Sequence, residues 1–84
     1  MSQILISYES KVLSKTNRVK FLYALRGRDN KSGIIAHYGA EMIGKNTILA
    51  PESTKEELKT FFTSWKTPLV IYTVDIKEKE DVTL

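Results

Sequence analysis

The sequence predicts an α+β domain whose elements follow the order β-α-β-β-α-β. Residues typical of strands occur at both ends of the chain and flank a turn in its middle. Two segments with the apolar spacing of helices separate these strands. A chain of 84 residues has the length of one domain, which we assign to residues 1–76, followed by a charged C-terminal tail at residues 77–84.

The first strand and the first helix are expected within residues 3–27. QILISY, residues 3–8, has apolar side chains on both faces, which is typical of a strand inside a sheet. SKTNRVKFLYALRG, residues 14–27, has apolar residues at helical spacing and ends at a glycine, a common helix stop. Three of its first residues can accept a hydrogen bond as N-cap: Ser14, Thr16 and Asn17.

The middle of the chain predicts a loop, a short helix and a hairpin. RDNKSG, residues 28–33, has the composition of a loop, and IIAHYG, residues 34–39, predicts one or two helical turns. Two short strands near Glu41–Ile43 and Thr47–Ala50 flank a Gly-Lys-Asn turn, whose glycine and asparagine tolerate positive φ.

The second long helix and the last strand complete the pattern. STKEELKTFFTSWK, residues 53–66, begins with Ser53 and Glu56 at the spacing of a capping box. Its apolar residues recur at i, i+3, i+4 and i+7 and predict one buried stripe: Leu58, Phe61, Phe62 and Trp65. LVIYTVDI, residues 69–76, predicts a strand.

This order of elements is that of the ferredoxin-like βαββαβ fold, a four-stranded antiparallel sheet with two helices on one face. The other face of such a sheet is open to water unless something covers it. Residues 3–8 carry apolar side chains on both faces, and each apolar square ångström left wet forfeits about 25 cal/mol. The sequence therefore predicts a homodimer joined sheet to sheet.

Composition excludes several classes of protein. The chain contains no cysteine, so a disulfide and a thiolate zinc site are excluded. The N-terminal residues lack the pattern of a signal peptide, and no apolar run approaches the roughly 18 residues that span a bilayer. We therefore expect a cytoplasmic protein with no membrane partner.

Positive charge is concentrated in one segment. Residues 11–31 contain seven Lys or Arg and one acid, a balance of +6, whereas the rest of the chain carries −3. Such an asymmetry is typical of a surface that faces anions, and nucleic acid is the expected partner. The alternatives are a solvated helix with a loop tip, or contact with an acidic protein. The candidate phosphate contacts are Lys11, Lys15, Arg18, Lys20, Arg26, Arg28 and Lys31.

Two other features are interpreted as structural. His37 has no second ligand at metal-binding spacing, so it is expected to be a packed or half-exposed residue. GKNT, residues 44–47, lacks the upstream glycine of a phosphate-binding loop and is expected to be a hairpin turn.

Four segments together resemble a known family: SYESKVLSKTN, RVKFLYAL, YGAEMIGKNTILAP and STKEELKTFFTSW. Over about residues 3–76, the chain resembles the ferredoxin-like superfamily that includes the small CRISPR-associated spacer-integration endoribonuclease-like proteins. The middle domain of the phenylacetate-degradation repressor and the N-terminal domain of chromate-resistance regulators have a similar pattern. This resemblance implies a dimer that associates with nucleic acid.

The resemblance also identifies one weak catalytic candidate. Active CRISPR-associated members carry an aspartate at the end of the first strand, which binds a metal ion in the dimer cleft. The matching position here holds Glu9, which is longer by one methylene and is not the family residue. Two such carboxylates across a dimer axis could bind one Mg²⁺; otherwise Glu9 is a turn residue and no cofactor is expected.

Together these observations predict a small dimeric protein that binds nucleic acid or another polyanion without catalysis. Its first helix and the following loop would make the contacts. A metal-dependent nuclease of the CRISPR-associated kind, with Glu9 as ligand, is the enzymatic alternative. The third alternative is a protein–protein interaction module, such as a small regulatory or inhibitor protein of a mobile element.

Overall fold

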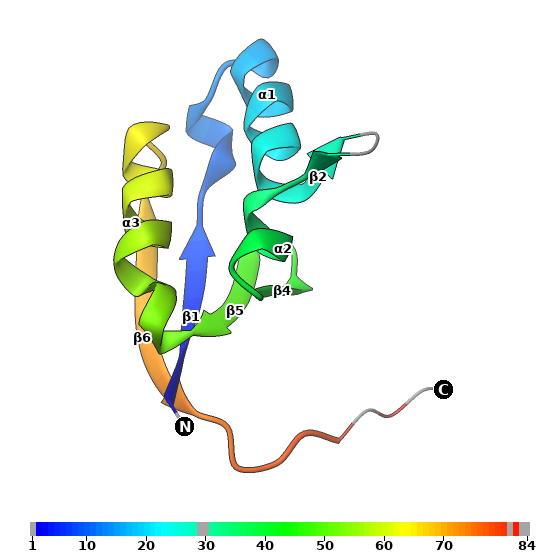
Figure 1. The fold of residues 1–84 in the computed structure, drawn as a ribbon. Helices are drawn as coiled ribbons and strands as arrows, with labels where there is room; N and C mark the ends of the chain where they lie inside the picture. Colours follow the sequence, from blue (N-terminus) through cyan, green and yellow to red (C-terminus); the bar gives the residue numbers. More distant parts are fainter. Residues whose placement is uncertain (1, 29–30, 81, 83–84) are drawn as a thin grey trace.

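The chain folds into two layers, a sheet and a set of helices packed on one of its faces (Figure 1). The computed structural model describes residues 2–28, 31–80 and 82. In chain order the elements are β1 (Ser2–Tyr8), η1 (Ser10–Val12), α1 (Lys15–Arg26), β2 (Gly27–Arg28), β3 (Lys31–Ser32), α2 (Ile34–His37), β4 (Glu41–Gly44), β5 (Thr47–Pro51), η2 (Glu52–Thr54), α3 (Lys55–Ser64) and β6 (Leu69–Asp75).

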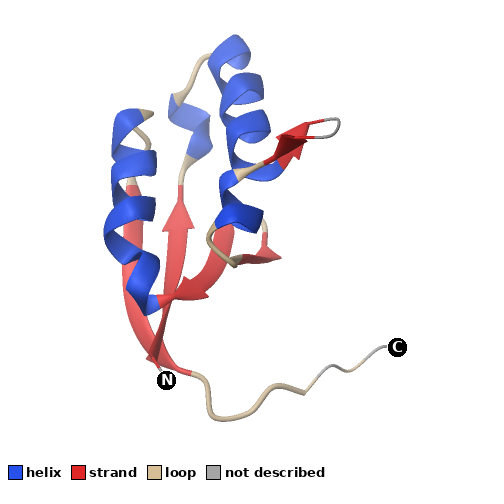
Figure 2. Ribbon diagram, viewed as in Figure 1, coloured by secondary structure: helices blue, strands red, loops and turns tan. Residues whose placement is uncertain are grey.

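The sheet has four antiparallel strands in the spatial order β4-β5-β1-β6. Numbered along the chain, the four strands therefore lie in the order 2-3-1-4, and with α1 and α3 the chain has the element order βαββαβ. This confirms the α+β class and the antiparallel sheet predicted from the sequence. Figure 2 shows the sheet behind α1 and α3, which lie over the same face.

Apolar residues from the sheet and both long helices meet in one core. On β1, Ile4, Ile6 and Tyr8 point to the helix side and are buried. Opposite them are buried residues of both helices: Phe21 and Leu25 from α1, and Leu58 and Phe62 from α3. Each such side chain stabilises the fold by about 1.5–3 kcal/mol relative to an exposed one. The predicted stripe of α3 is confirmed, since Phe61 and Trp65 also pack against this core.

The segment predicted as a loop, residues 28–33, contains a short ribbon instead. β2 and β3 pair antiparallel, with Gly27 opposite Ser32 and Arg28 opposite Lys31. The ribbon projects away from the sheet and helices (Figure 1). Asp29 and Asn30, which connect its strands, lie outside the described residues, as do the side chains of Arg28 and Lys31.

The predicted capping box of the second long helix is wrong. Ser53 lies inside the 3₁₀ turn η2, so α3 begins one residue later than the capping box requires. Its N-cap is Thr54, whose hydroxyl donates to the carbonyl of Pro51 at 2.7 Å and caps no helical N–H. The continuous 3₁₀-to-α path keeps the backbone of Ser53 turned, and a capping residue needs extended backbone.

The short helix and the hairpin predicted in the middle of the chain are present in the structure, although Gly44 ends β4 without a positive φ. α2 is one helical turn that ends before Gly39, where φ is 66°. The β4–β5 hairpin turns at Lys45 and Asn46, and Asn46 adopts a φ of 59°. No helix among the described residues is both long enough and apolar enough to cross a membrane. In the tail, the Nζ atom of Lys79 lies 3.6 Å from a carboxylate oxygen of Glu41.

Candidate nucleic-acid interface

The orientation of α1 is fixed by its two buried residues. Phe21 and Leu25 are spaced i, i+4 and both face the core, so the opposite side of the helix faces solvent. Ser14 caps the first turn by accepting a hydrogen bond from the N–H of Asn17 at 3.2 Å. Gly27 ends the helix with a φ of 92°. We call the solvent-exposed side of this helix the α1 face: Lys15, Thr16, Val19, Lys20, Tyr23 and Arg26.

Positive charge dominates the α1 face and its approach. Residues 10–28 contain six Lys or Arg and no Asp or Glu. Lys11, Lys15, Lys20 and Arg26 are all exposed. Within the part of the chain that the structure describes, no ion pair joins any of them to a carboxylate. These exposed cations thus have no acidic partner among the described residues, as a surface for anions requires.

The charge at the start of α1 opposes the helix dipole. The first turn contains no acidic residue, and Lys15 and Arg18 lie near the positive end of the dipole. In α3, by contrast, Glu56 and Glu57 occupy the first turn, where they stabilise the helix. A cation at a helix N-terminus costs a few tenths of a kcal/mol at the surface. Helix stability therefore does not account for the basic start of α1, whereas contact with an anion would.

Arg18 is engaged within the fold. Its side chain is half-buried, and Nη2 donates to the carbonyls of Lys11 and Leu13 at 3.5 and 3.4 Å. These contacts tie the segment before α1 to the helix. The structure thus brings Lys15, Lys20 and Arg26 together on one helix and gives Arg18 a positioning role.

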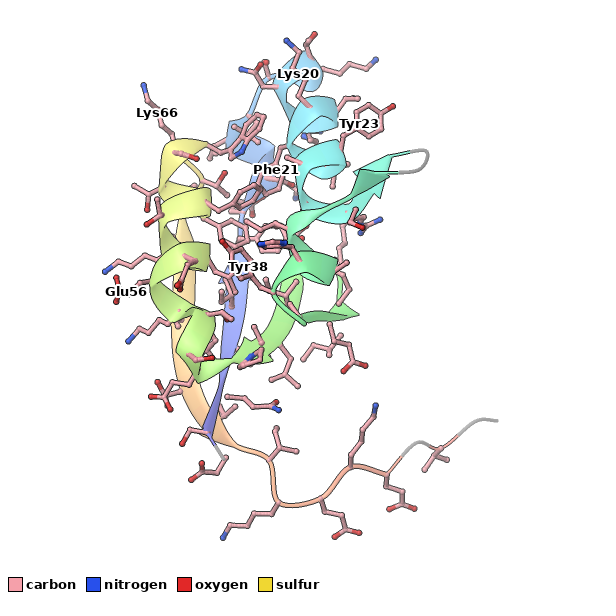
Figure 3. The ribbon with its side chains drawn as sticks, in the orientation of Figure 1. Lys20, Phe21, Tyr23, Tyr38, Glu56 and Lys66 are labelled. Atoms are coloured by element: carbon pink, nitrogen blue, oxygen red, sulfur yellow. The ribbon has the colours of Figure 1, made fainter. Side chains whose placement is uncertain are left out.

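Two exposed apolar side chains lie among these cations. Val19 and Tyr23 are each 43% exposed. Figure 3 shows Tyr23 on the side of α1 away from α3, while Phe21 points toward α3. A shallow hollow of about 500 Å³ runs along the helix, lined by Lys15, Thr16, Val19, Lys20 and Tyr23. The sequence contains a signal for this surface. Two pairs of apolar residues in α1 have the i, i+4 spacing, Phe21 with Leu25 and Val19 with Tyr23, and only one pair can face the sheet.

The weak catalytic candidate Glu9 caps a turn. Its carboxylate accepts a hydrogen bond from the N–H of Lys11 at 2.9 Å and so caps η1. It borders an open hollow of about 240 Å³ together with Pro68 and Val70. Among the described residues, no three His, Cys, Asp or Glu side chains gather as a metal site would require. His37 is exposed and packs edge-on against Tyr38, with ring centroids 4.7 Å apart.

The face of the sheet opposite the helices carries apolar side chains. Leu5 in β1 pairs with Leu49 on one side and Tyr72 on the other. Val70 and Tyr72 are 51% and 53% exposed. The strands of this sheet contain no Lys or Arg. We call this surface the open sheet face: Leu5, Leu49, Val70, Tyr72 and Val74.

Comparison with known proteins adds no assignment. No protein-family profile, no curated protein and no solved structure matches this chain. The features of this chain that indicate a function are therefore the two surfaces described above, one basic and one apolar.

Proposed function

We propose that this protein binds nucleic acid through the α1 face, without catalysis, and that it does so as a homodimer. The observation that carries the proposal is the acid-free run of residues 10–28, which holds exposed Lys15, Lys20 and Arg26 on one helix. Each phosphate that such a cation neutralises releases condensed counterions, and this release drives association at low salt. Arg26 adds the planar donor geometry that suits a phosphate.

The proposed fold family is ferredoxin-like. The strand order 2-3-1-4 and the element order βαββαβ support it. The resemblance to the CRISPR-associated and repressor members of that superfamily is part of the same proposal, and it favours nucleic acid over other polyanions.

The open sheet face supports the proposed homodimer. Its centre is apolar and its strands hold no Lys or Arg, while the carboxylate of Glu41, opposite Leu49, lies on the edge strand β4. A second copy of the same face can therefore pack on the apolar centre and leave this charge at the rim. The four strands cover roughly 350 Å² as a flat projection, at about 3.3 Å per residue and about 4.8 Å between strands. A standard interface buries about 800 Å² on each partner. We therefore expect a dimer that depends on protein concentration.

Fluorescence anisotropy with labelled DNA tests the proposed binding. The unmodified protein should bind a 20-nucleotide single strand and the matching duplex at about 50 mM salt, and lose roughly 20- to 40-fold in affinity at about 200 mM, as expected for about three neutralised phosphates. The double variant Lys20→Glu, Arg26→Glu should weaken binding to every sequence and reduce the salt dependence by about two counterions.

The matched control is Lys59→Glu. Lys59 is an exposed lysine of α3, on a helix that also carries Glu56 and Glu57. The Lys59→Glu substitution changes the net charge as much as one α1 substitution does. Because Lys59 lies outside the α1 face, this substitution should alter the affinity for DNA by less than about twofold. Absence of binding to both DNA forms at low salt, or equal losses in the α1 and α3 variants, would refute the proposal.

A further inference from the structure

β6 forms one edge of the sheet and lacks the features that protect edge strands. In the order β4-β5-β1-β6 it has a strand neighbour on one side only. Its pairing with β1 runs without a bulge from Leu69 to Asp75, and its seven residues include no proline, lysine or arginine. Natural proteins shield an edge with those residues, with bulges or with a covering segment. The free side of β6 thus presents backbone N–H and C=O groups to another strand.

β4, at the opposite edge, is protected. It has only four residues, and its register shifts between Met42 and Gly44. It begins with Glu41, whose carboxylate lies 3.6 Å from the Nζ atom of Lys79. The chain after β6 therefore reaches the β4 side of the sheet, and Figure 1 shows residues 76–80 running away from the free side of β6. Within the described part of the chain, one edge is closed to a further strand and the other is open.

We propose that β6 is a self-association site, where a second copy of this chain adds its own β6 antiparallel and extends the sheet from four strands to eight. We call this contact the edge pair. It consists of backbone hydrogen bonds between the two strands and of side-chain pairs on both faces of the joined sheet. The inference goes beyond the proposed function, because the edge pair requires neither nucleic acid nor the sheet-to-sheet dimer.

The side chains of β6 complement a second copy of the same strand. Tyr72 is the middle residue of β6, so a symmetric antiparallel pair places it opposite its own copy. On the same face Val70 then lies opposite Val74, and aromatic and β-branched pairs of this kind stabilise sheets. Asp75 is the only charged residue of β6 and lies opposite Leu69, so the edge pair brings no two carboxylates together.

A second copy as partner also supplies area that the sheet-to-sheet dimer lacks. Residues opposite each other in paired strands point to the same face, so the helices of both copies lie on one side and both open sheet faces on the other. The joined open face covers roughly 700 Å² as a flat projection, twice the roughly 350 Å² of one copy. This area approaches the about 800 Å² that each partner buries in a standard interface. The two contacts together therefore build a four-chain particle at high protein concentration.

Single cysteines give a direct test, because the chain has no cysteine of its own. Tyr72→Cys places two thiols at the centre of the edge pair, where the Cα atoms are about 4.5–5.5 Å apart and a disulfide can form. Stacked sheets lie about 10 Å apart, beyond the limit of about 7 Å, so the sheet-to-sheet contact cannot form this bond. With oxidised glutathione, most of the Tyr72→Cys protein should run at about twice 9.6 kDa on a non-reducing gel.

Glu41→Cys is the matched control. Glu41 lies in the same row across the sheet as Tyr72, with Leu49 and Leu5 between them, but on the edge strand β4. The Glu41→Cys protein should run at 9.6 kDa after the same oxidation. Circular dichroism verifies that both variants are folded.

Thr73→Lys separates the two contacts. Thr73 is exposed and pairs with the buried Ile4, so its side chain lies on the helix side of the sheet and outside the open sheet face. A lysine on an edge strand is a device by which natural proteins block strand addition. Sedimentation equilibrium at high concentration should show about four times 9.6 kDa for the unmodified protein and about twice for Thr73→Lys. Thr60→Lys, at an exposed threonine of α3, should keep the four-chain particle.

The outcomes separate the edge pair from the proposed function. Equal masses of the Thr73→Lys and unmodified proteins at every concentration, or equal cross-linking of Tyr72→Cys and Glu41→Cys, overturn the edge pair whatever the affinity for DNA. Absence of DNA binding at low salt overturns the nucleic-acid proposal and leaves the edge pair standing. If Thr73→Lys is a monomer where the unmodified protein is a dimer, the edge pair is that dimer, and the sheet-to-sheet contact is overturned instead.

Discussion

At the scale of single residues, Tyr8 shows how the core is built around aromatic contacts. Its ring centroid lies 5.8 Å from that of Phe21 and 5.0 Å from that of Phe62, so it joins β1 to both long helices. Its hydroxyl donates weakly to the sulfur of Met42 at 3.9 Å. Burial raises the pKa of Tyr8 above its ordinary value of 10.0, and the nearby charge of Arg26 acts in the opposite direction.

The raised pKa of Tyr8 predicts a loss of stability in alkali. Above pH 10 or so, the unfolded chain loses the phenolic proton while the folded chain keeps it, so the free energy of unfolding falls as pH rises. The stabilisation is complete below the unfolded pKa and is lost as pH rises through the folded pKa. Urea unfolding at about pH 9 and about pH 11 should show a larger loss for the unmodified protein than for Tyr8→Phe. Equal losses in both proteins would contradict this assignment.

At the scale of elements, the ribbon depends on two glycines for different reasons. Gly27 has a φ of 92°, a conformation that favours glycine, and it turns the chain out of α1. Gly33 is buried, and its extended backbone is one that any residue adopts. A glycine is needed here because there is no space for a side chain. A Cβ atom on Gly33 would overlap the backbone of Leu25, Arg26 and Gly27. The end of α1 and the start of α2 thus touch backbone to backbone.

Gly33→Ala is therefore expected to separate the ribbon from the end of α1. The overlap is with backbone, which cannot rotate away, so the free energy of unfolding should fall by about 1–3 kcal/mol in urea denaturation. Gly44→Ala is the control, because the nearest atom to its Cβ would be the Cβ of Thr47 at 3.9 Å, an ordinary contact. It should change stability by less than about 0.5 kcal/mol. If both variants unfold at the same urea concentration, the close contact at Gly33 is not significant.

At the scale of the whole molecule, charge and apolar surface lie on opposite sides. The α1 face belongs to the helix layer, which covers one side of the sheet (Figure 1), and the open sheet face is the other side of the sheet. A sheet-to-sheet dimer would leave both α1 faces exposed and pointing away from each other. In such a dimer, self-association and phosphate contact use different residues, so each can be removed without the other.

Two exposed valines on opposite layers test this separation. Val70→Arg places a cation on the open sheet face and should shift the solution mass from about twice 9.6 kDa toward 9.6 kDa, because burying that charge is unfavourable. Val19→Arg makes the same change on the α1 face and should leave the mass unaltered. Sedimentation equilibrium over a range of concentrations measures both. A monomer at every concentration in the unmodified protein, or an equal effect of both substitutions, would rule out the sheet-to-sheet dimer.

Local pattern determined the elements of this protein and their order. β1, α1, the β4–β5 hairpin, α3 and β6 follow the predicted segments within about two residues. Residues close together in the sequence carry the information for each element. Alternating apolar and polar residues indicate the strands, and the i, i+4 spacing with Gly27 indicates α1. The Gly-Lys-Asn turn indicates the hairpin. The concentration of positive charge in residues 11–31 is likewise a property of the chain alone.

Tertiary packing decided which side chains of those elements are buried in the core and which remain exposed to solvent. The sequence offered Phe21 with Leu25, and Val19 with Tyr23, as equivalent apolar pairs on α1, and packing against Tyr8 and Phe62 selected the first. Contacts between segments also engaged Arg18 with backbone carbonyls before α1. Hydrophobic spacing specifies that a helix has an inner face. The rotation that defines this face comes from the shape of the partner surface, and that shape exists only once the chain has folded.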